Sequence, residues 1–242
     1  MARPGGRVEA DIARFTEEVQ RALGERLVCL VLHGSAAGEE WVRGRSDVNT
    51  AIVVPQVTLD VLEILAPLVA RWRTRGFALP VLMDHEYLAR ARDIFPMELD
   101  DIRRQHRLLA GTDSFGSLDL ERAALQRECE YEARGKLLRL RALFLETART
   151  PAAIDELMTG SLKSFLIVLR HLLRLRQDEH AHGYHDVLAA GERLLGPLPT
   201  LRRLLGHRRG EPRLGRAALR AEFGAYLAEI ERIVEAVDGL GG

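Results

Sequence analysis

The stretch VLHGSAAGEEWVRGRSDVNTAIVV, residues 31–54, decides the fold of this chain. It reads as an apolar strand, a Gly-Ser turn, a loop, and a second strand that begins near Asp47 and Asn49. The apolar run over residues 27–33 is continuous and rich in valine and leucine, which is typical of a buried strand. Asp47 and Asn49 are two positions apart, so a strand points both side chains to one face.

Apolar spacing on either side of this stretch predicts the rest of the first half. The expected elements are a helix over residues 8–23, a helix from a Thr58 cap to about residue 75, and strands over 77–83, 94–102 and 106–110. Pro80 lies inside the first of these three strands. Because proline cannot donate to a strand ladder, it favours an edge position or a bulge there.

After Asp113 the sequence becomes helical throughout. Leu, Arg, Glu and Ala recur with helical periodicity over residues 118–148, 151–177, 184–194, 198–206 and 213–238. The sequence therefore predicts an α+β protein with two domains. Residues 1–113 would form a mixed sheet with flanking helices, and residues 114–242 a helical bundle.

Composition excludes several classes of protein. Hydrophobic residues make up 47% and charged residues 29%, which argues against wholesale disorder. Basic and acidic residues balance at 35 each, so the basic excess of many nucleic-acid-binding proteins is missing. The two cysteines have no neighbouring ligands at metal-site spacing, which favours free thiols in a reducing cytoplasm. No secretory signal is expected at the N-terminus, and no apolar run reaches the roughly 18 residues of a membrane span.

Residues 31–54 resemble the nucleotidyltransferase superfamily that includes polymerase β and the aminoglycoside nucleotidyltransferases. Members of that superfamily have an apolar strand followed by Gly-Ser or Gly-Gly. About ten residues later they have a strand on which acidic and apolar residues alternate. Gly34-Ser35 and Ser46-Asp47-Val48-Asn49 occupy these places here. The resemblance implies a nucleotidyltransferase-type sheet in the first domain and a helical domain that binds the acceptor.

The resemblance also implies a nucleotide and metal site. Gly34 would let a triphosphate approach the backbone, and Ser35 would offer a hydroxyl and an N–H group to phosphate oxygens. Asp47 and the residue at position 49 would hold Mg²⁺ between the nucleotide and the acceptor hydroxyl. A third carboxylate on a neighbouring strand completes such sites. Glu98 is the candidate for it, with Asp100 as the second choice.

This sequence departs from the family pattern at Asn49, where relatives have a second acid. An amide oxygen can bind a metal, but it brings no charge, so the Mg²⁺ site is expected to be weakened. Two functions follow. The chain transfers a nucleoside monophosphate from an NTP to an acceptor hydroxyl, or it is a degenerate member that only binds nucleotide or a partner. The acceptor (small molecule, protein or RNA), the NTP and the oligomeric state are not determined by the sequence.

The helical half offers further candidates. Lys163 follows Gly160-Ser161 and could contact nucleotide phosphates as a point charge. Glu128 or Glu132 could serve as the general base for the acceptor hydroxyl. The plainer interpretation is an ordinary helical ion pair between Glu132 and Lys136.

Two weaker patterns point to RNA. Arg174 and His180 have the R-x5-H spacing that resembles the ribonuclease motif of HEPN helical domains, although chance explains so short a motif in an arginine-rich chain. The basic stretch that starts at Leu201 could bind RNA or phosphate. It has no interleaved aromatic residues for base stacking, which favours a solvated helix end and loop.

Overall fold

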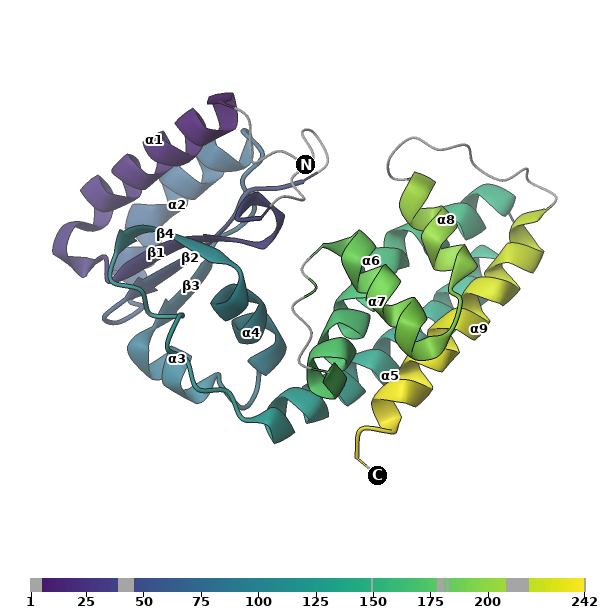
Figure 1. Cartoon of the computed structure of the whole chain (residues 1–242). Helices are drawn as coiled ribbons and strands as arrows, with labels where there is room; N and C mark the ends of the chain where they lie inside the picture. The colour runs from purple at the N-terminus through teal and green to yellow at the C-terminus, as the bar shows by residue number, and fades with distance from the viewer. Residues whose placement is uncertain are drawn as a thin grey trace. The chain divides into compact units, whose positions relative to one another are not determined.

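The computed structural model describes residues 6–38, 46–148, 150–177, 181, 183–207 and 218–241. The chain divides into two compact units, residues 1–124 and 125–242. The first unit is α+β and the second is helical (Figure 1). The boundary expected from the sequence, at residue 113, falls before this division. The following segment stays with the first unit, because Phe115 is fully buried in its core.

Within the described residues, the first unit is built on a mixed four-stranded sheet. The strands β1 (Cys29–His33), β2 (Asn49–Val54), β3 (Val81–Asp84) and β4 (His106–Gly111) lie in the order β3-β2-β1-β4. Strand β1 is antiparallel to β2 and to β4, and β2 is parallel to β3. The predicted strand over residues 77–83 is confirmed in part. Its regular pairing as β3 begins after Pro80, and β3 lies at an edge of the sheet, as the proline predicted.

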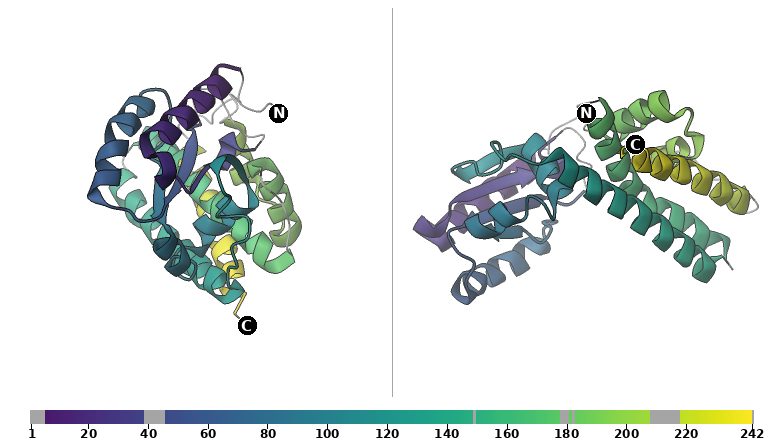
Figure 2. Two further views of the ribbon diagram at one scale, coloured as in Figure 1. Left: turned by 90° about the vertical axis from the view of Figure 1, so that its left-hand side faces the viewer. Right: turned by 90° about the horizontal axis from the view of Figure 1, so that it is seen from below.

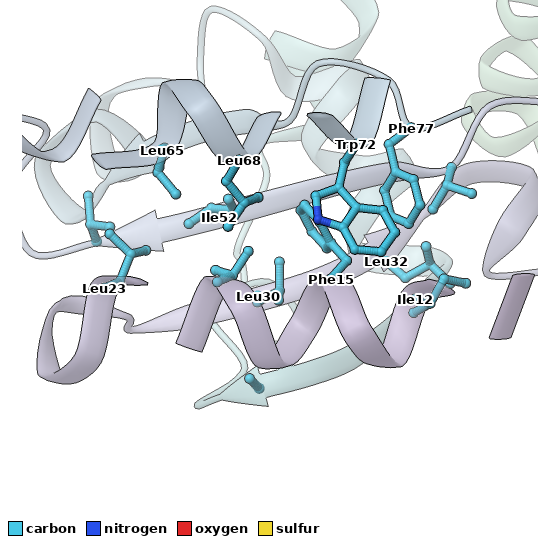
Figure 3. Close-up of a cluster of buried hydrophobic side chains, with 14 of the residues drawn as sticks. Ile12, Phe15, Leu23, Leu30, Leu32, Ile52, Leu65, Leu68, Trp72 and Phe77 are labelled. Atoms are coloured by element: carbon cyan, nitrogen blue, oxygen red, sulfur yellow. The ribbon is translucent and has the colours of Figure 1, made fainter. Parts of the chain in front are cut away.

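Helices α1 (Gly6–Leu23) and α2 (Leu59–Arg73) cover one face of the sheet (Figure 1). Phe15, Trp72 and Phe77 form an aromatic cluster between these helices and the strands (Figure 3), with ring centroids 4.8 to 5.7 Å apart. The expected cap of α2 is confirmed, because the Val61 N–H donates to the Thr58 hydroxyl at 3.4 Å. This core packs against one face of β1 and β2.

The opposite face of the sheet is covered by α3 (His85–Arg90) and α4 (Pro96–Arg104). The core on this side combines sheet residues Cys29, Val31, Ala51 and Val53 with Leu88, Leu99, Ile102 and Phe115. Both faces of β1 are therefore buried, which explains why its sequence is apolar without alternation. Helix α3 was not expected from the sequence, although Asp84 caps it by accepting a hydrogen bond from the Tyr87 N–H at 2.8 Å.

The strand predicted over residues 94–102 is wrong, because this segment forms the helix α4. Pro96 occupies the first turn of the helix, where its missing N–H costs nothing. Leu99 and Ile102, three positions apart, both face the sheet. The alternation of Met97 and Leu99 with acidic residues imitates a strand, but the segment is only nine residues long, too short for periodicity to separate the two structures.

The second unit consists of long helices that follow the predicted pattern closely. They are α5 (Arg122–Thr147), α6 (Pro151–Gln177), α7 (Tyr184–Leu195), α8 (Pro199–His207) and α9 (Leu219–Asp238). Helices α5 and α9 run side by side (Figure 2), joined by ion pairs from Arg134 to Asp238 and from Arg141 to Glu231. No helix in the part of the chain that the structure describes is long and apolar enough to cross a membrane.

Candidate functional site

The turn after β1 packs directly against the start of β2. Gly34 adopts a left-handed backbone conformation with a φ angle of 68°, which favours glycine. A Cβ atom at this position would lie 3.0 Å from the side-chain nitrogen Nδ2 of Asn49. The strand register places His33, the residue before the turn, opposite Asn49. The structure therefore brings the Gly34-Ser35 turn and Asn49 together, as the sequence predicted.

Asp47 and Asn49 lie on one face of the sheet. Val48, between them, is buried on the face covered by α1 and α2, and it forms an isolated bridge to Phe77. Because side chains alternate along an extended chain, positions 47 and 49 point to the other face, which α4 covers. Asp47 is exposed and Asn49 is half-buried. Asn49 thus places an amide beside the turn, and Asp47 presents an exposed carboxylate two residues earlier.

Helix α4 borders the same corner of the sheet. A Cβ atom at Gly38 would lie 1.9 Å from the side-chain nitrogen of Gln105, so Gln105, directly after α4, lies against the end of the turn. Glu98 is on this helix and reaches solvent. Partial burial, together with the negative charge of Asp101, raises the pKa of Glu98 above its ordinary value. A raised pKa makes the carboxylate of Glu98 a stronger proton acceptor.

Asp100, the second choice for the third carboxylate, forms ion pairs with arginines of its own helix, α4. Its side chain is 1% exposed, and its oxygen Oδ1 lies 2.7 Å from Arg103 and 2.9 Å from Arg104. These ion pairs stabilise α4 from inside the unit. Glu98 therefore stays the candidate from this helix, although it projects from a helix and not from a strand as expected.

His33 and Asp101 belong to this corner, and neither was predicted from the sequence as a site residue. Burial lowers the pKa of His33 to about 4, an effect that the negative charge of Asp101 partly offsets. The ring nitrogen Nε2 of His33 is buried without a hydrogen-bond partner within the described residues. A polar residue that ends an otherwise apolar strand, directly before Gly34, was the signal that could have identified His33.

We expect the neutral state of His33 to make the first unit sensitive to acid. The pKa of His33 rises from about 4 in the folded chain to its ordinary 6.5 on unfolding. The unfolded state therefore binds more protons, and stability is lost as the pH falls from 6.5 through 4. Between about pH 7.5 and pH 4.5, His33 should account for a loss of about 2–3 kcal/mol.

Urea unfolding measured by tryptophan fluorescence tests this expectation. Both tryptophans, Trp41 and Trp72, lie in the first unit, so the signal reports that unit alone. His33→Gln should reduce the acid sensitivity relative to the unmodified chain. An unchanged pH dependence in His33→Gln would contradict a buried neutral imidazole.

The described residues contain no group of three His, Cys, Asp or Glu side chains arranged to hold a metal ion. At the start of β2, within the part of the chain that the structure describes, Asp47 offers a carboxylate and Asn49 a neutral oxygen. Mg²⁺ is commonly bound by one or two carboxylates together with substrate phosphates and water. This donor set therefore fits an ion that arrives with a nucleotide better than a resident ion.

Lys163 lies in the second unit, exposed on α6. Gly160 and Ser161, which precede it, lie inside the continuous helix and not at a helix start. The Ser161 hydroxyl donates to the Leu157 carbonyl at 2.7 Å, a bond within the helix that accommodates the serine. The assignment of Lys163 to phosphate binding thus rests on the sequence alone.

The other candidates of the helical half have structural roles or lie outside the described residues. Glu132 and Lys136 form the expected ion pair on α5. Arg174 is buried in α6, whereas His180, its partner in the R-x5-H spacing, is outside the described residues. Helix α8 ends at His207, and the rest of the basic stretch, residues 208–216, is also outside them.

The mixed sheet, the glycine turn after its central strand and the helical second unit together define a nucleotidyltransferase-type fold. No family model and no curated protein sequence matches the chain. Among solved structures, the chain resembles the crystal structure of spectinomycin adenyltransferase AAD(9) from Enterococcus faecialis with ATP and spectinomycin. The match has a TM-score of 0.57 and 13% sequence identity, and it covers 95% of this chain and 99% of that one. At 13% sequence identity, the structural similarity shows that the two chains share a fold.

Proposed function

We propose that this chain binds a nucleoside triphosphate at the Gly34-Ser35 turn and transfers its nucleoside monophosphate to a hydroxyl group of a small molecule. The observation that carries the proposal is the contact of this turn with Asn49, whose side chain lies on the same side of the extended chain as that of Asp47. The fold of the whole chain, shared with an enzyme whose structure contains ATP and spectinomycin, supports a nucleotide and a small acceptor.

Each residue of the corner has a chemical task in this proposal. Gly34 leaves space for the triphosphate, and Ser35 donates hydrogen bonds to its oxygens. The acceptor hydroxyl oxygen forms a bond to the α-phosphorus, while the bond from that phosphorus to the departing pyrophosphate breaks. Glu98, with its raised pKa, accepts the proton of the hydroxyl. Mg²⁺, bound by Asp47 and Asn49 together with the phosphates, would supply charge neutralisation.

The glycine turn provides a direct test of nucleotide binding. Gly34→Ala adds a methyl group at the contact with Asn49, so we expect the affinity for Mg²⁺ and a non-hydrolysable ATP analogue to fall at least about tenfold. Isothermal titration calorimetry measures this affinity. Gly76→Ala is the matched control, because Gly76 also has a positive φ, of 87°, but a Cβ there meets nothing within 4 Å.

Both variants should lose a similar amount of stability, about 1–2 kcal/mol, from backbone strain. Only Gly34→Ala should lose nucleotide affinity. If the two variants bind the analogue equally well, the turn is not the phosphate site.

A second candidate function is nucleotide binding without transfer. The observation that favours it is Asn49, which leaves Asp47 as the one carboxylate of residues 46–49. A chain of this kind would bind the ATP analogue in calorimetry, yet release no pyrophosphate from ATP with any hydroxyl acceptor. Comparing the affinity with the turnover of the same preparation separates the two functions.

A further inference from the structure

Helix α5 carries apolar residues on two opposite faces. One face is buried in the helical unit and includes Cys129, Ala133, Leu137 and Leu140. On the other face, Tyr131, Leu138 and Leu145 are 76%, 64% and 83% exposed. These three large side chains recur every seven residues, close to two helical turns, so they form a line along the helix.

Small residues complete this line. Gly135 and Ala142 are exposed and alternate with the three large side chains, at the spacing of the two apolar positions of a heptad. We call Tyr131, Gly135, Leu138, Ala142 and Leu145 the α5 stripe. It spans residues 131–145, or about 21 Å of helix. An exposed apolar line of this length is unusual on a monomeric protein and marks an interaction surface.

Charged rows border the α5 stripe on both sides. One row consists of Arg127, Arg134 and Arg141, and the other of Glu132, Arg139 and Glu146. Arg134 and Arg141 are held in place by Asp238 and Glu231 of α9, at 2.9 and 2.7 Å. One side of the stripe thus carries three arginines, two of them paired with carboxylates of α9. The other side carries Arg139 and two glutamates, of which Glu132 is paired with Lys136.

We propose that the α5 stripe is covered by the α5 stripe of a second copy of this chain, with the two helices parallel. In a parallel pair the arginine row of each helix faces the mixed row of the other, so that Arg127 and Arg141 meet Glu132 and Glu146, whereas Arg134 meets Arg139. An antiparallel pair would place each arginine row against its own copy. Charge complementarity therefore selects the parallel arrangement, in which every stripe residue meets its counterpart across a two-fold axis.

The pair is expected to be reversible. One helix face contributes a small area, so the association belongs with weak interfaces and not with obligate dimers. The surface lies wholly within the second unit and involves no residue of the proposed nucleotide site. The oligomeric state should therefore be independent of nucleotide.

Analytical ultracentrifugation of the full chain tests the pair. The unmodified chain should shift from monomer to dimer with rising concentration, between about 1 and 300 µM. The double variant Leu138→Glu/Leu145→Glu should weaken the dimer at least about tenfold, because it places four carboxylates in the interface. Leu59→Glu/Leu62→Glu on α2 is the matched control, with two exposed leucines off the stripe.

Single cysteines test the direction of the helices. The native thiols, Cys29 and Cys129, are buried and should not interfere. In a parallel pair, Tyr131→Cys and Leu145→Cys each form a disulfide-linked dimer under mild oxidation. Tyr87→Cys, at an exposed site on α3, should not. Cross-linking at only one of the two stripe positions would overturn the parallel arrangement. A chain that stays monomeric throughout, or equal dissociation of the α2 control, would overturn the pair itself.

Discussion

Replacing Gly111 by alanine is expected to destabilise the first unit by about 4 kcal/mol or more, the largest effect of any single substitution considered for this chain. A Cβ atom at Gly111 would lie 2.1 Å from the Val28 carbonyl oxygen and 2.8 Å from its carbon. Both atoms belong to the backbone, so they cannot move without breaking the pairing of β1 with β4. Gly111 also has a positive φ, of 79°, which adds strain.

Urea unfolding monitored by tryptophan fluorescence measures this loss in the first unit. Gly76→Ala separates the two causes, because Gly76 has the same sign of φ and open space around it. The control should lose only about 1–2 kcal/mol. Similar losses in the two variants would mean that the contact with Val28 relaxes easily. The result bears on function, since the strand that Gly111 supports, β1, carries the turn at Gly34.

The second large effect is expected from Asn49→Asp. Asn49 lies beside the turn at Gly34, and an aspartate there would give positions 47 and 49 the pair of carboxylates that the resembled family has. At an effective dielectric of about 20, a unit charge about 4 Å from another interacts by roughly 4 kcal/mol before desolvation. After desolvation we expect Mg²⁺ to bind at least about tenfold more tightly in the presence of the ATP analogue.

Calorimetry with Mg²⁺ and the analogue, together with pyrophosphate release from ATP, measures the two consequences. A gain of transfer activity in Asn49→Asp would identify the natural chain as a degenerate relative. Activity already present in the unmodified chain would identify Asn49 as a tolerated ligand. Asn49→Leu is the control of similar size, since it removes the amide oxygen without adding charge. If Asn49→Asp leaves Mg²⁺ affinity unchanged, position 49 does not contact the metal.

The sequence was sufficient for the elements whose apolar pattern is long or continuous. The run over residues 27–33 predicted a buried strand, and β1 is buried on both faces between two cores. The long helices of the second unit were predicted because their periodicity extends over many turns. The strand prediction for residues 94–102 was wrong because a nine-residue alternating pattern fits a helix and a strand equally well. Pro96 is also compatible with the first turn of a helix.

The residue types of the candidate site were visible in the sequence, but their grouping was not. Gly34 and Asn49 could be singled out from the spacing of the motif. The positions of Asp101 and Gln105 beside His33 and the turn follow from how α4 packs on the sheet, and no local pattern encodes that packing. The surroundings of Lys163 show that a local pattern can also mislead. A Gly-Ser pair by itself indicates a helix start, but Gly160 and Ser161 lie inside a helix that the neighbouring residues stabilise.

The sequence by itself determined the α+β order of the chain, the central strand, the long helices and the glycine turn. These features depend on hydrophobic periodicity and on the backbone freedom of glycine, both of which act over a few neighbouring residues. Only the tertiary structure decided that residues 94–102 are helical, that β1 pairs His33 with Asn49, and that a second apolar face of α5 stays exposed. The reason is physical: burial and strand register are set by contacts between segments far apart in the chain, and those contacts override weak local preferences.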